Sequence, residues 1–154
     1  MKALDKMIYA MMAIVVLTLS GCQDNGYIGR LYGTWRFASY SVDGVEIVGA
    51  MIEESTISFQ NNITSVTTFV DEYLTDLTYY GTWKEEGDQF TLDFTHHDDV
   101  RPGGGDVYSA PTWLGMTAEE PMVMRVSEST SRAFTLTWTD PQGAVKVYRL
   151  KKTW

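Results

Sequence analysis

Apolar and polar residues alternate along most of the chain after residue 32, in short runs that end at turn-forming residues. The run 89–94 shows this most clearly, because Phe90, Leu92 and Phe94 share one face and polar residues occupy the other. A period of two is typical of a β-strand that buries one face. The same pattern predicts further strands over residues 33–40, 46–52, 56–60, 63–70, 73–85, 121–127, 131–139 and 144–152.

Short turn sequences separate these runs. Asp43-Gly44 is a pair that adopts the positive φ angles of a two-residue hairpin. Residues 95–111 include three consecutive glycines and are expected to be irregular. No stretch shows a long helical period. The pattern therefore predicts an all-β protein, an antiparallel up-and-down barrel of about eight strands, since closure removes exposed strand edges. A two-layer sandwich would use the same pattern and stays open as the alternative.

The first part of the chain has a different character. Lys2 and Lys6 both precede an uncharged apolar run over residues 7–19. As a helix these residues would extend about 20 Å, which is short of a hydrocarbon core about 30 Å thick. The run fits the hydrophobic region of a secretory signal peptide. An uncleaved transmembrane anchor is the alternative.

The sequence Leu19-Ser20-Gly21-Cys22 resembles the lipobox of bacterial lipoproteins, in which an aliphatic and two small residues precede a cysteine. The resemblance implies cleavage before Cys22 and lipid attachment to that cysteine. Cys22 is the only cysteine, so the chain has no intramolecular disulfide, and acylation explains a lone exported thiol. We expect a lipid-anchored protein of the cell envelope, at the outer membrane.

This interpretation divides the chain into a signal peptide (1–21), a lipidated tether (22–32) and one barrel domain (33–154). Without the signal peptide, 10 basic and 19 acidic residues remain, a net charge of −9. Such acidity argues against nucleic acid as a partner. It also argues against docking on anionic lipid head groups through a basic face, which leaves membrane attachment to the lipid.

Gly33-Thr34-Trp35 resembles the Gly-x-Trp motif of lipocalins, and more closely the lipocalin-like domain of small secreted bacterial lipoproteins. A second such strand, 80–83, and a final hairpin over 136–152 extend the resemblance to residues 31–152. It implies that Trp35 closes one end of the barrel and that Gly33 lets the backbone bend beside it. It also implies a basic residue of the last strand stacked on the indole. Arg149 is the first candidate for that structural role and Lys151 the second.

Aromatic side chains are candidates for a ligand-binding interior. A lipocalin-like barrel encloses space for side chains or for one small ligand. The same aromatic residues would serve equally well as a filled core. The candidates for contact with a small hydrophobic ligand are Trp35, Phe37, Phe59, Trp83, Phe90 and Trp138.

One cluster has metal-ligand chemistry. His96-His97-Asp98-Asp99 offers zinc ligands, but neighbouring residues of a strand point to opposite faces. We interpret it as a solvated strand end and expect no metal, no cofactor and no catalytic residues. No Gly-x-Ser-x-Gly motif is present, and we expect the protein not to be an enzyme.

Two functions follow from these features. The first is a membrane-anchored, lipocalin-like lipoprotein that binds a small hydrophobic ligand in the cell envelope. The second is a filled barrel without ligand, an accessory or inhibitor protein that presents residues 95–111 to an unknown protein partner. A lined cavity of about 300 Å³ or more would favour the first, and a filled interior the second.

Overall fold

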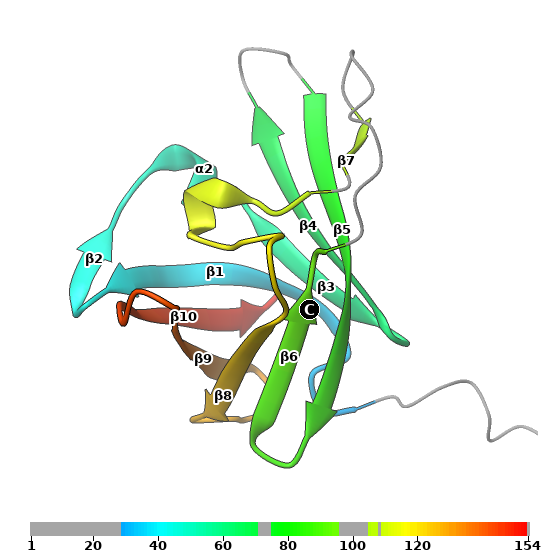
Figure 1. Ribbon diagram of the computed structural model, residues 1–154. Helices are drawn as coiled ribbons and strands as arrows, with labels where there is room; N and C mark the ends of the chain where they lie inside the picture. Colours follow the sequence, from blue (N-terminus) through cyan, green and yellow to red (C-terminus); the bar gives the residue numbers. More distant parts are fainter. Residues whose placement is uncertain (1–28, 71–74, 96–104, 108, 154) are drawn as a thin grey trace, which may run out of the picture.

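The structure is a computed structural model that describes residues 29–70, 75–95, 105–107 and 109–153. In this part of the chain, successive antiparallel strands pair side by side, and the last returns to pair with the first (Figure 1). The eight barrel strands are β1 (Gly33–Val42), β3 (Thr56–Gln60), β4 (Ile63–Val70), β5 (Thr75–Glu86), β6 (Gln89–Asp93), β8 (Met122–Ser127), β9 (Ala133–Thr139) and β10 (Val145–Lys152).

The pairing of β1 with β10 confirms the predicted barrel and excludes an open sandwich. This pairing runs from Trp35 opposite Lys152 to Val42 opposite Lys146. The eight strands pair in the order in which they follow one another along the chain, as in a meander. Each strand is joined to the next by a short turn or by a segment that leaves the sheet. The closed sheet has an inner face, which inward side chains of every strand fill.

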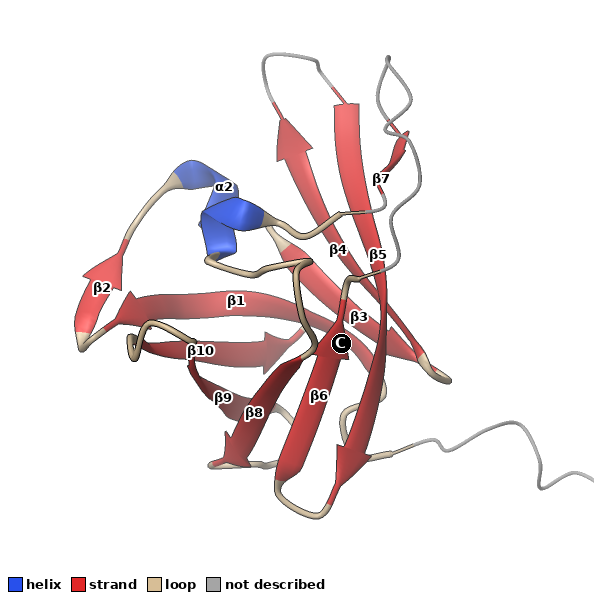
Figure 2. Cartoon of the chain, in the orientation of Figure 1, coloured by secondary structure: helices blue, strands red, loops and turns tan. Residues whose placement is uncertain are grey.

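Four further short elements of the described residues are not among the eight barrel strands (Figure 2). They are β2 (Val45–Ile47), α2 (Ala50–Glu53), β7 (Gly105–Val107) and the 3-10 helix η1 (Thr112–Leu114). The strand expected over 46–52 is wrong beyond Ile47, since the chain leaves β2 and forms the single turn α2. Part of the stretch expected to be irregular is β7, which pairs in parallel with β5. The error over residues 46–52 arises because alternation over so few residues does not distinguish a strand from a helical turn.

The two ends of the barrel differ. At the end that we call the floor, β1 begins and β10 finishes, with Trp35 beside Lys152. At the opposite end, the mouth, β1 turns into β2 through Asp43 and Gly44, whose φ angles of 50° and 81° fit the predicted hairpin turn. Both α2 and η1 lie at the mouth and contact each other.

The residues just before β1 pack onto the floor. Leu31 has no exposed surface, and its carbonyl accepts a hydrogen bond from Trp35 Nε1 at 2.7 Å. Arg30 Nε lies 2.6 Å from Glu85 Oε1. Residues 29–32, which the sequence assigned to the tether, are therefore attached to the barrel. The predicted signal peptide and Cys22 lie outside the described residues. Within those residues, no helix is long and apolar enough to cross a membrane.

Candidate functional site

The six aromatic residues predicted to contact a ligand all lie inside the barrel. Their exposed fractions range from 0 to 5%. They come from β1, β3, β5, β6 and β9, so the closed sheet brings together positions far apart in the sequence. The residues in question are Trp35, Phe37, Phe59, Trp83, Phe90 and Trp138. Their contact with a ligand stays a prediction, because what they contact in the structure is one another and the rest of the core.

Aromatic rings occupy the half of the interior nearer the floor. The ring of Phe59 lies 5.2 Å from both Trp83 and Phe90, and the last two are 5.6 Å apart. Trp35 meets Phe134 edge to face, with ring centroids 4.6 Å apart. These separations are those of aromatic pairs in van der Waals contact. The floor half is therefore a packed aromatic cluster.

Trp35 closes the floor as the Gly-x-Trp resemblance implied, but with a different basic partner. The ammonium of Lys152 lies 4.9 Å from the centre of the indole. The same ammonium donates a hydrogen bond to the Tyr32 carbonyl at 3.0 Å. Gly33 has a φ of 116°, which glycine adopts without strain, and an added Cβ would come within 3.2 Å of Lys152.

The predicted stack of Arg149 on Trp35 is wrong, and so is the second choice, Lys151. Both side chains are exposed, and Arg149 stands opposite Ser39 in the β1–β10 pairing. The reason is the period of two: Tyr148, Leu150 and Lys152 point inward, so the odd-numbered residues between them point outward. Which residue of β10 faces Trp35 depends on the register of the β1–β10 pairing. The Gly-x-Trp motif alone does not determine that register.

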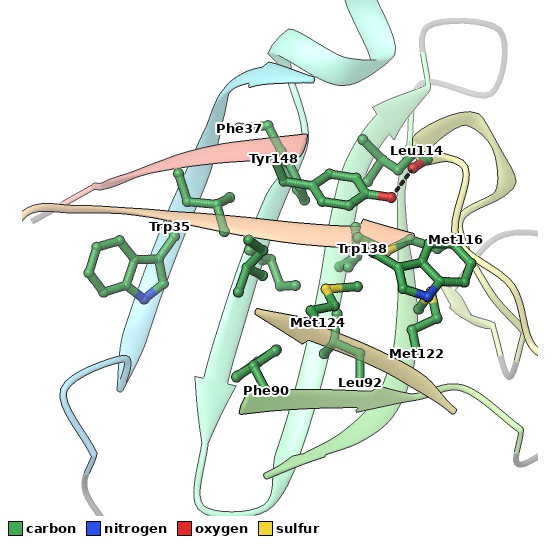
Figure 3. Close-up of a cluster of buried hydrophobic side chains, with 14 of the residues drawn as sticks. Trp35, Phe37, Phe90, Leu92, Leu114, Met116, Met122, Met124, Trp138 and Tyr148 are labelled. Atoms are coloured by element: carbon green, nitrogen blue, oxygen red, sulfur yellow. Dashed lines mark hydrogen bonds between the residues drawn. The ribbon is translucent and has the colours of Figure 1, made fainter. Parts of the chain in front are cut away.

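A segment of chain fills the mouth. Residues 110–118, which we call the plug, include η1 and pass over the barrel opening between β7 and β8. Leu114 and Met116 of the plug are 0% and 3% exposed and belong to the same buried cluster as Met122 and Met124 of β8 (Figure 3). The mouth half of the interior is therefore completed by side chains from outside the sheet.

Two polar side chains of β10 hold the plug by its backbone. The Tyr148 hydroxyl donates to the Leu114 carbonyl at 2.8 Å (Figure 3). Lys146 Nζ donates to the Gly115 carbonyl, also at 2.8 Å. The Tyr40 ring stacks on Tyr148 with centroids 5.0 Å apart and planes 6° apart. We call Tyr40, Lys146 and Tyr148 the clamp.

The protonation states of the clamp residues favour their hydrogen bonds and ion pair. Burial raises the pKa of Tyr148 well above its ordinary value, with the neighbouring Tyr40 adding to the effect. Burial also raises the pKa of Tyr40. Burial would raise the pKa of Asp140 as well, but hydrogen bonds from Ala144 and Lys146 outweigh it and lower that pKa. Both phenols therefore stay protonated at neutral pH, and Lys146 lies 3.1 Å from an ionised Asp140.

The packing leaves no room for water beside the central side chains. Phe59, Phe90, Leu92, Met122 and Tyr148 have no exposed surface at all. A void large enough for a water molecule would expose the atoms that line it, so none borders these residues. The part of the interior that these five side chains line is therefore filled in the described structure.

Sequence reasoning missed the plug and the clamp. Trp113, Leu114 and Met116 are apolar residues in a segment without regular alternation, and that apolar content was the available signal. Trp113 contacts Tyr79 edge to face at 5.0 Å, while its Nε1 atom is buried without a hydrogen-bond partner among the described residues. The His96–Asp99 cluster lies outside the described residues, so the expected absence of a metal site stays a prediction.

Comparison with known proteins places this geometry in a fold. The sequence is matched by no protein-family profile and is not significantly similar to any curated protein. Among solved structures, it is similar to a lipocalin-like protein from Bacteroides uniformis, with 15% identity and a TM-score of 0.56 over 80% of this chain and 99% of that one. An uncharacterized protein from Bacteroides eggerthii is similar over 77% of this chain and 98% of that one, with 15% identity and a TM-score of 0.51. At this identity the likeness concerns the fold alone: the chain forms a closed antiparallel barrel of the lipocalin-like kind.

Proposed function

We propose that this protein is a membrane-anchored lipoprotein whose filled barrel acts through its outer surface, as an accessory or inhibitor of a protein partner. The observation that carries the proposal is the filled interior. A carrier of a small hydrophobic molecule needs an enclosed space of about 300 Å³ or more. Here the corresponding region is occupied by core aromatics, by methionines and by the plug.

The anchor rests on the sequence. A positively flanked apolar run, too short to span a bilayer comfortably, leads directly to the lipobox-like sequence ending at Cys22. The described chain begins at Gly29 and joins the barrel at its floor, where Leu31 is buried. A lipid on Cys22 would accordingly attach the floor end to the membrane and leave the mouth free to meet a partner.

An exposed apolar segment at the mouth is the best candidate for that contact. Val45, Ile47, Val48 and Met51 have exposed fractions of 66, 37, 78 and 37%. Exposed apolar residues concentrated in one place mark interaction surfaces more often than scattered ones do. We call these four residues the mouth patch. The acidic residues that accompany the patch are Glu46, Glu53 and Glu54, so a partner with an apolar surface bordered by basic residues would fit it.

Site-specific photo-crosslinking in the native host tests this function. A photoreactive residue at Val48 should give one discrete crosslinked protein species. Val123 on β8 is a matched control, because it is also an exposed valine, at 50%, but lies away from the mouth patch. The proposal fails if position 48 gives no protein adduct, or if positions 48 and 123 give the same adducts.

One observation favours a second function, the binding of a hydrophobic ligand after displacement of the plug. Met116, Met122 and Met124 lie together at the mouth, and methionine side chains adapt their shape to a bound molecule. Trp113 Nε1, which has no hydrogen-bond partner in the described part of the chain, would be available to a polar group of that ligand. In this case the protein would co-purify with the ligand.

A further inference from the structure

Four exposed basic side chains lie on the outer face where β1, β9 and β10 meet, from the middle of β10 to the floor. Arg36 stands directly opposite Lys151, and Arg149 occupies the next outward position of β10. Arg132 precedes β9, and its carbonyl accepts a 2.8 Å hydrogen bond from the Lys152 amide. We call Arg36, Arg132, Arg149 and Lys151 the basic strip.

No member of the basic strip forms an ion pair with another residue that the structure describes. The pairs in that part of the chain are Arg30–Glu85, Lys84–Glu86, Arg125–Asp88 and Lys146–Asp140. Glu128 lines the same shallow hollow as Arg149 and Lys151, but its carboxylate accepts a hydrogen bond from Thr135. Arg36 and Lys151 are like charges directly opposite each other, an arrangement that generally disfavours strand pairing. An external group of negative charge would offset such repulsion.

The mouth carries the opposite charge. No lysine or arginine occurs between Phe37 and Trp83, a stretch that includes the mouth patch. The described acidic residues around the mouth include Asp43, Glu46, Glu53, Glu54, Asp76, Glu119, Glu120 and Asp140, the last of which pairs with Lys146 of β10. The net charge of −8 is therefore unevenly distributed between the two ends, although Glu86, Asp88 and Glu128 also lie towards the floor. For this reason, composition alone argued against a basic face.

We propose that the basic strip lies on the anionic phospholipid head groups of the membrane that holds the anchor. This inference rests on the proposed lipid anchor. Six residues lie between Cys22 and Gly29, so the seven steps from one to the other span at most about 25 Å. The chain joins the barrel at the floor, beside Lys152. The basic strip is thus held near the bilayer, where head-group charge acts over a Debye length of about 8–10 Å.

Vesicle binding without the lipid tests this inference. The probe is the mature chain from residue 22 with Cys22→Ser, mixed with vesicles of phosphatidylcholine alone or of phosphatidylcholine and phosphatidylglycerol in equal parts. At low salt, the protein should sediment with the anionic vesicles and not with the neutral ones. Each basic residue at the surface strengthens such binding roughly fivefold. The double variant R149E/K151E should therefore lose most of the binding, by more than about 20-fold.

The control variant K84E/R125E has the same net charge and alters basic residues that are already paired. It should bind within a few-fold of the parent chain. Equal binding of both double variants, or equal binding to both kinds of vesicle, would overturn the inference. Sedimentation velocity without vesicles examines the rival occupant, the acidic mouth of a second copy. Self-association that R149E/K151E abolishes would also overturn it. Because the probe carries no lipid, this result is independent of whether Cys22 is acylated or a protein binds the mouth patch.

Discussion

Trp35 is held in its place by contacts on several sides. Its Nε1 donates to Leu31, its ring meets Phe134 edge to face, and the Lys152 ammonium lies over its face. Only the last of these involves charge. A buried indole removes a large apolar area from water, whereas a cation over its face adds a smaller electrostatic attraction. The two contributions to stability should therefore be separable by substitution.

We expect Trp35→Ala to lower the free energy of unfolding by about 3–5 kcal/mol. Lys152→Met keeps the aliphatic stem but removes the charge, and it should cost about 0.5–2 kcal/mol. The double variant should cost less than the sum, because the residues touch. Lys151→Met is the matched control and should change stability by less than about 0.5 kcal/mol. Urea denaturation measures all four, and a control as costly as Lys152→Met would contradict the register.

Tyr148 shows how a buried phenol makes stability depend on pH. Its pKa is higher in the folded than in the unfolded state, where it is about 10. A raised pKa gives a contribution that is complete below the unfolded pKa and is lost as pH rises through the folded one. The partly buried Tyr40 acts in the same direction.

We expect Tyr148→Phe to cost about 1–3 kcal/mol at neutral pH, because the Leu114 carbonyl loses its donor. The difference in unfolding free energy between wild type and variant should narrow above about pH 10. Urea melts at a series of pH values between about 8 and 11 would show this. A difference that stays constant or widens with pH would show that the buried hydroxyl does not control the alkaline loss of stability.

At the scale of elements, the plug depends on Gly115. This residue ends η1 with a φ of 63°, and an added Cβ would overlap the Tyr40 hydroxyl. Gly87, in the β5–β6 turn, has a similar φ of 69° but open space around it. A left-handed backbone costs a residue with a Cβ about 1–2 kcal/mol at either position. Only at Gly115 does a steric clash with the clamp add to this cost.

Gly115→Ala should therefore destabilise more than Gly87→Ala and should loosen the plug. Hydrogen exchange reports the loosening at the amides of Leu114 and Gly115, which bond to Pro111 and Thr112. We expect faster exchange there in Gly115→Ala than in Gly87→Ala. If both variants lose the same stability and leave those amides unchanged, the clamp does not hold the plug.

The strands were predictable because each buries one face, and the pattern of residues such as Phe90, Leu92 and Phe94 repeats every two positions. The sequence predicted that the sheet closes but not the register of the closing β1–β10 pair. For this reason Arg149 was chosen as the residue stacked on Trp35, and Lys152 was missed. The plug could not be predicted, because Leu114 and Met116 are buried by contacts from distant strands and not by a local period. The interior aromatics were found, but whether they surround a ligand depends on that plug.

In the whole molecule, an anchor at Cys22 would hold the floor near the membrane and leave the mouth exposed. The chain enters at the floor, where Leu31 and Trp35 pack together. The basic strip extends towards the same end, and the apolar mouth patch with its acidic neighbours lies at the other. Anchoring through Cys22 would thus orient the barrel, with two different surfaces facing membrane and partner. This arrangement depends on the acylation of Cys22.

Cys22→Ala should abolish labelling of the protein by a radioactive fatty acid, since no other cysteine is present. It should also leave the chain uncleaved or mislocalised. Ser20→Ala, which keeps a small residue before the cleavage site, is the matched control and should be labelled like the wild type. Equal label on wild type and Cys22→Ala would remove the lipid anchor from the account.

Native mass spectrometry of the protein purified from its own host tests the filled barrel most directly. The account predicts a single folded species whose mass equals the polypeptide plus its covalent lipid. That mass should be the same in native and denaturing spectra, because the core aromatics and the plug leave no space for a ligand. A further stoichiometric mass that is present in the native spectrum and released on denaturation would contradict it. The barrel would then be a carrier that opens by moving the plug.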